Sequence, residues 1–325
     1  MRHRTVFACG QAVQFFWGGA LALNELKSLY APANSGSEFV ELVGFNVHYR
    51  DEGDRKLPVI MLHGVVASLH TWDDWLPEFS QDYRVIRFDL PGFGLTGPSV
   101  DGIYTIERML KVVSLLMDHL GVAKASFAGN SLGGYVAWNF ALSQPERVEK
   151  LVLIDPAGYT MKKMPWMIAA SGLPGSTVLM PIWMPRALIA QGVKDVYGDQ
   201  RRIKPNVIER YYRLSRRPGN RKAMMQIFRQ LVLINRTQLH QTPAAVARLR
   251  VPALLLWGES DRWISPAHVQ LWQRDLPGIQ VKTYPGVGHL PMEEIPWKSA
   301  ADALQFMLAR DSLEFSTPSV AANDG

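Results

Sequence analysis

One stretch of five residues, Gly-Asn-Ser-Leu-Gly at 129–133, restricts the possible folds of this chain more than any other. It follows the apolar run 125–128 and precedes apolar residues at helical spacing over 132–143. A helix interior disfavours such glycines, since each costs about 1 kcal/mol relative to alanine. A sharp turn from a strand into a helix requires them, because its central residue is strained and its flanking positions have no room for side chains. The stretch therefore predicts a strand–turn–helix unit that exposes the hydroxyl of Ser131, although a glycine-rich turn with an incidental serine has the same pattern.

Short apolar runs alternate with segments of helical periodicity along most of the chain. A run that is apolar throughout, such as 58–62, is expected of a strand buried on both faces. The expected strands are 38–43, 46–50, 58–62, 84–88, 125–128, 151–154, 253–257 and 279–284, and the expected helices are 105–120, 132–143, 266–275 and 297–308. This alternation predicts an α/β fold with a mostly parallel, doubly wound sheet.

The pattern changes between residues 158 and 239, where a segment rich in Met, Trp and Pro precedes a basic helical stretch. A helical block inserted between two strands predicts a cap over the carboxyl edge of the sheet, where open α/β sheets bind ligands. The expected organisation is an apolar N-terminal segment and linker at 1–37, a core at 38–157 and 240–310, a helical cap at 158–239 and a disordered tail at 311–325.

Two later loops carry the partners that a catalytic serine needs. A serine hydroxyl is a weak nucleophile and requires a neighbouring base, which an acid orients. Asp261 follows the expected strand 253–257, and His289 follows the expected strand 279–284. The chain order serine, acid, histidine places all three groups at one edge of a parallel sheet. We therefore predict Ser131, Asp261 and His289 as a catalytic triad, with Asp155, which follows its own strand, as the weaker alternative acid.

Five motifs give the chain a resemblance to a known family. They are His63-Gly64-Val65, Asp89-Leu90-Pro91-Gly92-Phe93-Gly94, Gly129-Asn130-Ser131-Leu132-Gly133-Gly134, Trp257-Gly258-Glu259-Ser260-Asp261 and Gly288-His289. With them the chain resembles the α/β-hydrolase superfamily, in particular capped serine hydrolases of the esterase and lipase kind, from about residue 38 to residue 308. The resemblance implies an oxyanion hole formed by the backbone N–H groups of Val65 and Leu132, and a donor at a helix N-terminus suits that role. It also implies that His63 braces the oxyanion loop and that Asp89 is structural.

The serine nucleophile favours hydrolysis of carboxylic esters. Members of the superfamily that open epoxides or remove halogens resemble this chain less, because they carry an aspartate at the position of Ser131. Hydrolases of meta-cleavage products, which break C–C bonds, share the pair Asn130-Ser131, but they usually have a glycine-rich oxyanion loop and a tryptophan after the catalytic histidine. This chain has Val-Val-Ala at 65–67 and Leu290 at those places. We expect a serine esterase for apolar acyl or aromatic substrates, with a C–C hydrolase, a cofactor-free haloperoxidase and a receptor without turnover as the alternatives.

Composition and charge argue against several other classes of function. The chain is 47% apolar and 20% charged, as a globular protein is, and the single Cys9 rules out an intramolecular disulfide. No Cys/His cluster has metal-ligand spacing and no phosphate-binding glycine loop is present, so we expect neither a metal nor another cofactor. The net charge of +6 is concentrated at 194–222, where ten Lys/Arg against three Asp/Glu leave +7. This basic window indicates a solvated helical face or a surface for anionic lipid, and not nucleic acid, because no recognition motif accompanies it.

The N-terminal residues favour an association with membranes. Residues 5–23 are uncharged and follow Arg2 and Arg4, and their length approaches the ~20 residues of a membrane-spanning helix. The motif Ala-Leu-Ala at 20–22 also fits cleavage of a signal peptide. An uncleaved anchor, a cleaved signal and a helix packed on the domain are the alternatives. Because a basic flank keeps the N-terminus in the cytoplasm, we expect a membrane-anchored or exported protein with an extracytoplasmic domain, or else a cytoplasmic protein, that acts on a small ester.

Overall fold

The computed structural model describes residues 21–55 and 57–309. The predictions about the uncharged segment 5–23 therefore lie outside the described residues except at 21–23, and the prediction about the tail 311–325 lies outside them entirely. Within the described part of the chain, no helix is both long enough and apolar enough to cross a lipid bilayer.

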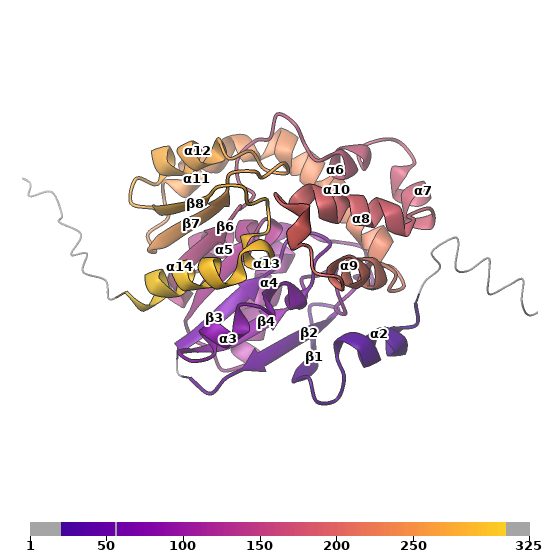
Figure 1. Ribbon diagram of the computed structural model, residues 1–325, viewed down its shortest axis with the longest axis horizontal. Helices are drawn as coiled ribbons and strands as arrows, with labels where there is room; N and C mark the ends of the chain where they lie inside the picture. The colour runs from indigo at the N-terminus through magenta and orange to yellow at the C-terminus, as the bar shows by residue number, and fades with distance from the viewer. Residues whose placement is uncertain (1–20, 56, 310–325) are drawn as a thin grey trace, which may run out of the picture.

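An eight-stranded sheet forms the centre of the molecule (Figure 1). Its strands are β1 (Ser37–Leu42), β2 (Phe45–Glu52), β3 (Leu57–Leu62), β4 (Tyr83–Phe88), β5 (Ala125–Asn130), β6 (Val148–Ile154), β7 (Ala253–Gly258) and β8 (Gln280–Tyr284). They lie in the order β1-β2-β4-β3-β5-β6-β7-β8, with β2 antiparallel to both of its neighbours and the remaining pairs parallel. The predicted α/β class with a mostly parallel sheet is confirmed.

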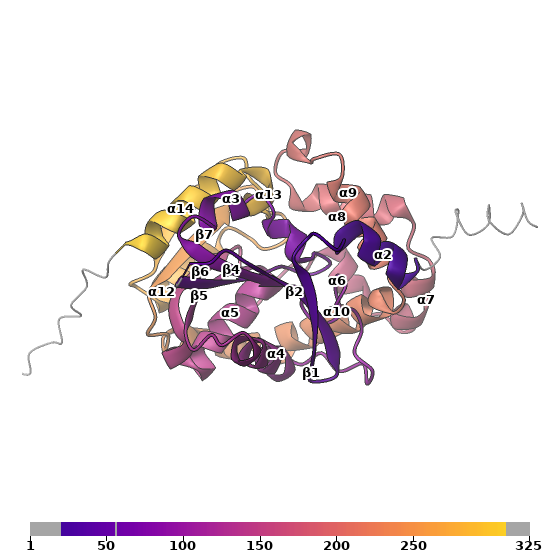
Figure 2. The ribbon, with the colours of Figure 1, turned by 90° about the horizontal axis from the view of Figure 1, so that it is seen from below.

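Helices cover both faces of the sheet, as Figure 2 shows. One face carries α4 (Ile106–His119) and α5 (Leu132–Ser143), and the other carries α3 (Leu76–Phe79), α13 (Pro291–Glu294) and α14 (Pro296–Leu308). Helix α4 begins where the side chain of Thr105 accepts a hydrogen bond from the N–H of Arg108, which satisfies one of the free donors of its first turn. Soon after its end, Gly121 adopts a φ of +65°, which favours glycine.

The chain between β6 and β7 folds into a group of helices beside the carboxyl edge of the sheet (Figure 1). They are α6 (Trp166–Ala170), α7 (Ser176–Ile182), α8 (Arg186–Val196), α9 (Val207–Ser215), α10 (Asn220–Thr237) and α11 (Thr242–Val246), and α12 (His268–Asp275) follows β7. We call α6 to α10, with the loops between them, the cap. Its boundaries at 158 and 239 stay a prediction.

Helix α2 (Leu23–Tyr30) is among the helices that were not expected from the sequence. It lies in the segment 1–37, where an apolar segment followed by a linker was expected. Its Leu26 is fully buried and packs with Leu95 and Leu214, the latter from α9 of the cap. The first described residues are therefore packed on the domain.

The basic window 194–222 contains several ion pairs within the protein. Lys204 binds Asp74 at 2.6 Å, and the nearly buried Arg210 binds Glu293 at 2.7 Å. Such pairs neutralise part of the +7 charge internally. The structure thus favours a structural role for this window over a free surface for anionic lipid.

Candidate active site

The turn between β5 and α5 holds Ser131 in a strained backbone conformation. Its φ of +55° and ψ of −115° are values that residues other than glycine rarely adopt. A Cβ atom on Gly129 would lie 2.5 Å from the carbonyl oxygen of Gly133, and one on Gly133 would lie 2.1 Å from that of Leu62. The structure contains the predicted strand–turn–helix unit, and the close backbone approach explains both glycines.

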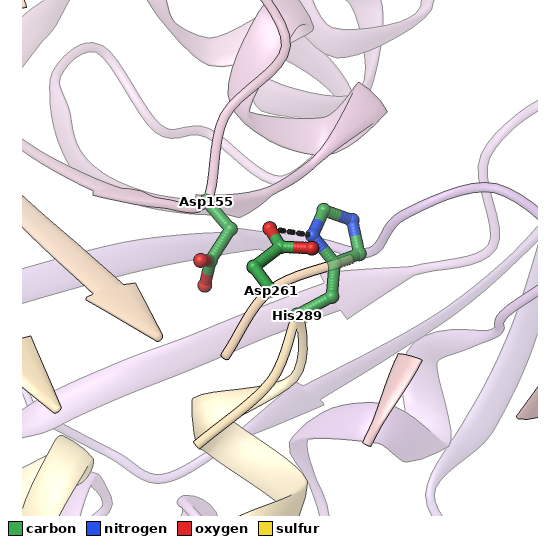
Figure 3. A group of neighbouring side chains, drawn as sticks. All are labelled: Asp155, Asp261 and His289. Carbon is green, nitrogen blue, oxygen red and sulfur yellow. Dashed lines mark hydrogen bonds and ion pairs between the residues drawn. The ribbon is translucent and has the colours of Figure 1, made fainter. Parts of the chain in front are cut away.

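His289 and Asp261 form a hydrogen-bonded pair at the ends of β8 and β7 (Figure 3). Nδ1 of His289 lies 2.7 Å from Oδ2 of Asp261. The other carboxylate oxygen accepts the N–H groups of Trp263 and Ile264, at 2.7 and 3.0 Å, which fixes the orientation of the carboxylate. Nε2 of His289 is buried and has no hydrogen-bond partner among the described residues. This nitrogen is thus available to a group in the cavity that Ser131 and His289 both line.

Asp155 lies beside this pair, directly after β6 (Figure 3). Its Oδ1 accepts the N–H of Gly258 at 3.0 Å, whereas its buried Oδ2 has no partner in the described part of the chain. Burial, and then the negative charge of Asp261, raise the pKa of Asp155 well above its usual value. Because Asp261 is the carboxylate that contacts the imidazole, the geometry favours Asp261 over Asp155 as the orienting acid.

The same three groups are close enough to share a metal ion. Candidate ligand atoms of Asp155, Asp261 and His289 lie within 4.8 Å of one another. Asp261, however, already accepts three hydrogen bonds, and one of them comes from Nδ1 of His289. The cluster is therefore arranged to polarise an imidazole, which is the requirement for general-base chemistry.

The two predicted oxyanion donors lie close to Ser131. Leu132 is the first residue of α5, so its N–H has no acceptor within the helix. Val65 follows β3 and lines the same cavities as Ser131. A Cβ atom on the adjacent Gly64 would lie 2.8 Å from Oδ1 of Asn130, and this close approach brings the β3 loop against the turn.

Two buried groups hold the neighbouring loops. Nε2 of His63 accepts the N–H of Leu90 at 2.9 Å and Nδ1 contacts the carbonyl oxygen of Gly64 at 2.7 Å, so Nδ1 carries the proton of a neutral ring. Burial lowers the pKa of His63. Burial alone would raise the pKa of Asp89. The contact of its Oδ2 with Nδ1 of His48, at 2.7 Å, and further histidines nearby keep this pKa well below the usual value. These contacts agree with the bracing and structural roles expected of the two residues.

Two apolar cavities meet at Ser131. Val65, Ser131 and Trp263 line both of them. The cap contributes Met167, Ile189 and Val193 to the first cavity and Ile168, Leu231 and Ile234 to the second, and Met161, which precedes α6, also lines the second. No Lys, Arg, Asp or Glu of residues 21–55 and 57–309 lines either cavity. The site suits a substrate with apolar groups on both sides of the reacting bond.

The comparison with protein families agrees with this geometry. Residues 58–296 match the family described as the alpha/beta hydrolase fold. The chain belongs to this family. An uncharacterized hydrolase of Bacillus subtilis (strain 168), YugF, is 29% identical over 256 residues, covering 78% of this chain and 91% of the relative. The 2-hydroxy-6-oxononadienedioate/2-hydroxy-6-oxononatrienedioate hydrolase of Comamonas testosteroni is 29% identical over 255 residues, covering 76% of this chain and 86% of the relative.

Solved structures of other α/β-hydrolases have the same fold. A meta-cleavage product hydrolase from Pseudomonas fluorescens IP01 aligns with a TM-score of 0.71 at 24% identity, covering 83% of this chain and 97% of that one. A membrane phospholipase A, described as a bacterial virulence factor, aligns with a TM-score of 0.67 at 23% identity, covering 93% of this chain and 90% of that one. The chain is thus a hydrolase of the α/β-hydrolase fold.

Three residues near the site of this α/β-hydrolase were not identified from the sequence as parts of it. Nδ2 of Asn130 donates to the carbonyl oxygens of Ile154 and His289, at 3.1 and 3.0 Å, and joins the serine turn to the histidine loop. The ring of Trp263 stacks on His289 with 5.9 Å between ring centroids. The third residue is Glu294. Asn130 lies inside the Gly-x-Ser-x-Gly motif and Trp263 lies two residues after Asp261, so both could have been found, whereas nothing in the sequence marks Glu294.

Glu294 joins the cap to the histidine loop of this α/β-hydrolase. Its carboxylate accepts the N–H groups of Gly198, Asp199 and Gly288, at 2.9, 3.1 and 2.5 Å. Beside it, the N–H of His289 donates to the carbonyl oxygen of Val196 at 2.7 Å. The chain after α8 and the loop that carries His289 are therefore held together by one buried carboxylate and one backbone bond.

Replacement Glu294→Gln is expected to lower the free energy of unfolding by about 2 kcal/mol, because hydrogen bonds to a buried charge are worth roughly 1.5–3 kcal/mol. The amide nitrogen of glutamine would also face an N–H donor. Urea unfolding followed by tryptophan fluorescence measures the change. Glu259→Gln is the matched control, since Glu259 is exposed. Among the described residues, Thr283 alone donates a hydrogen bond to its carboxylate. Equal unfolding midpoints for the two variants would contradict the role assigned to Glu294.

Proposed function

We propose that this α/β-hydrolase cleaves carboxylic esters that carry an apolar acyl or aromatic group. Ser131 attacks the ester carbonyl while Nε2 of His289 takes the hydroxyl proton, and Asp261 stabilises the resulting imidazolium. The N–H groups of Val65 and Leu132 stabilise the oxyanion, and loss of one such donor costs roughly 3 kcal/mol. His289 then protonates the leaving alcohol. Water, activated by the same imidazole, hydrolyses the acyl-enzyme and restores Ser131.

The observation that carries the proposal is the pair of uncharged, apolar cavities that meet at Ser131. An ester of a fatty or aromatic acid places its acyl group in one cavity and its alcohol group in the other. Burial of apolar groups there contributes roughly 25 cal/mol per Å² of apolar surface removed from water. The description of one solved neighbour as a membrane phospholipase A is in keeping with such a substrate.

Hydrolysis of a C–C bond in a meta-cleavage product is the second candidate. It is supported by the pair Asn130-Ser131 and by the relative named as a 2-hydroxy-6-oxononadienedioate/2-hydroxy-6-oxononatrienedioate hydrolase. Such a dienoate carries a carboxylate, which is costly to bury without a cationic partner. The cavities have no Lys or Arg lining from the described residues, and this favours the uncharged ester.

A panel of p-nitrophenyl esters with acyl chains of rising length tests the proposal beside a meta-cleavage dienoate. We expect kcat/KM to rise with chain length until the acyl cavity is filled, and we expect no turnover of the dienoate. Faster turnover of the dienoate than of every ester would replace the ester assignment by the C–C hydrolase. Binding of the panel without turnover of any member would favour a receptor on this fold.

The location of the enzyme is part of the proposal. The uncharged segment 5–23 behind Arg2 and Arg4 supports a membrane-anchored or exported protein with its catalytic domain outside the cytoplasm. Cell fractionation with protease protection tests this arrangement. A full-length chain that is recovered wholly in the cytosolic fraction with Met1 intact would establish the cytoplasmic alternative.

A further inference from the structure

Exposed apolar side chains are concentrated on the cap. Of the fourteen large apolar side chains that are exposed among residues 21–55 and 57–309, seven belong to α6, α7, α10 and adjacent loops. Six lie in one short stretch: Trp166, Leu173, Val178, Leu179, Ile182 and Trp183. The seventh is Leu233 of α10, against which both α6 and α7 pack. We call these seven side chains the apolar cap face.

Part of this face adjoins the candidate active site. Met167 and Ile168 of α6 line the two cavities that meet at Ser131, whereas Trp166 of the same short helix is exposed. One helix therefore separates the apolar cap face from the apolar interior of the site. An amphiphilic ester that leaves a lipid layer at this face would have only a short path to Ser131.

Basic residues surround the apolar cap face. The chain has no Asp or Glu between residues 156 and 194, or between residues 210 and 258. Lys162 and Lys163 precede α6 and are exposed. Arg229 and Arg236 are exposed on α10, four residues before and three residues after Leu233, which places them on the same side of that helix. One carboxylate, that of Asp195, contacts the face: it accepts a long hydrogen bond of 3.4 Å from Nε1 of Trp166.

An apolar centre with basic residues and tryptophans around it is the pattern of a surface that lies in a lipid interface. The apolar side chains enter the acyl region, indole rings prefer the headgroup level, and each Lys or Arg near an anionic leaflet contributes about 1 kcal/mol. A second copy of the chain fits this face less well, because the basic residues of the two copies would repel each other.

We propose that the apolar cap face docks on an anionic lipid surface, and that the active site takes its ester substrate from that surface. The docking step rests only on the exposed apolar side chains and on the basic residues around them. The delivery of substrate rests on the proposed ester hydrolysis. The docking surface lies on α6, α7 and α10 and thus differs from the basic window 194–222, where ion pairs within the protein use part of the charge.

The attachment point of the N-terminal segment agrees with this orientation. The N–H of Leu21, the first described residue, donates to the carbonyl oxygen of Arg216 at the end of α9 at 2.9 Å. Helices α2 and α7 lie toward the same end of the molecule, and α14 lies toward the opposite end (Figures 1 and 2). A segment that enters a bilayer ahead of Leu21 would hold this end of the molecule near the lipid.

Site-specific fluorescence on the full-length chain tests the docking step. Cys9 is the only cysteine, so Cys9→Ser allows single labelling of Leu179→Cys on α7 or of Trp297→Cys on α14 with an environment-sensitive fluorophore. Trp297 is the matched control, since it is 61% exposed and Leu179 is 67% exposed. Vesicles contain phosphatidylcholine with phosphatidylglycerol, or phosphatidylcholine alone. We expect the label at 179 to brighten severalfold with anionic vesicles and to be quenched by brominated acyl chains, and the label at 297 to stay unchanged. The response should weaken as salt rises.

Three results would overturn the docking proposal. The label at 179 could stay unchanged while the protein floats with the vesicles, in which case the N-terminal segment binds alone. The label could be shielded before vesicles are added, in which case part of this chain or a second copy covers the face. Absence of the protein from the vesicle fraction altogether would also refute docking.

A kinetic experiment tests the delivery of substrate. Leu179→Ser with Ile182→Ser is expected to lower the rate on an ester embedded in anionic vesicles roughly tenfold, because less apolar surface enters the lipid. The rate on a soluble short-chain ester should not change, since neither residue lines the cavities. Equal rates of this variant and the parent on the embedded ester would refute delivery. If no ester is cleaved at all, the proposed function fails, and the labelling experiment still decides the docking step.

Discussion

Replacement of Ser131 by alanine is expected to reduce ester hydrolysis by about a million-fold, the size of loss seen when the nucleophile of a serine triad is removed. The variant keeps the backbone of the turn, because alanine has the same Cβ atom that Ser131 already places there. Steady-state kinetics on the best p-nitrophenyl ester measures the loss. Labelling by a fluorophosphonate probe should disappear in parallel, because this probe bonds covalently to an activated serine oxygen.

Two controls separate loss of chemistry from loss of fold. The unfolding midpoint of Ser131→Ala should stay close to that of the parent, since the side chain oxygen is the only group removed. Ser126→Ala in the preceding strand β5 is a matched variant, because Ser126 is also buried, and it should keep both activity and labelling. Fluorophosphonate labelling that persists in Ser131→Ala would exclude Ser131 as the nucleophile.

Replacement Asp261→Asn is expected to lower kcat by roughly ten-thousand-fold, as the corresponding change does in serine proteases. The cause is the 2.7 Å contact between Oδ2 of Asp261 and Nδ1 of His289. An amide at this position stabilises the imidazolium less and can offer a donor to Nδ1, so that the wrong nitrogen of the ring carries the proton. The pre-steady-state rate of acylation measures this step directly.

Asp155→Asn is the matched variant for this experiment, because both carboxylates are buried and both lie beside His289. Burial and the negative charge of Asp261 raise the pKa of Asp155 well above its usual value, which favours the uncharged form of this carboxyl group. Because the carboxylate of Asp261, and not that of Asp155, contacts Nδ1 of His289, we expect a loss much smaller than that of Asp261→Asn. If Asp155→Asn proves the more damaging of the two, the acid role belongs to Asp155.

The sheet and the positions of Ser131, Asp261 and His289 after its strands could be predicted because each depends on local sequence. Buried parallel strands are apolar throughout, as 58–62 is, and the carboxyl ends of such strands meet at one edge of the sheet. The glycines at 129 and 133 mark the serine turn through steric exclusion alone. Both patterns can be recognised in the sequence without knowing which distant residues contact each other in the fold.

The remaining features depend on long-range contacts and could not be read from the sequence. Glu294 looks like an ordinary acidic residue of a short helix, and its role appears only when the cap segment at 198–199 folds against it. Helix α2 is too short for a strong periodic signal and is held by the burial of Leu26. The basic window carries +7 in the sequence, but Arg210 forms an ion pair with Glu293, which is far away in the sequence and lies in α13.

The bonds between the cap and the histidine loop restrict how this enzyme can open. His289 donates its backbone N–H to Val196, and Glu294 holds the residues that follow Val196. A movement that lifts the whole cap would break these bonds and release the loop that positions the base, so a fully open molecule would be catalytically silent. None of these bonds involves α6 or α7. Substrate would therefore have to enter through a movement of α6 and α7 that leaves the segment after α8 in place.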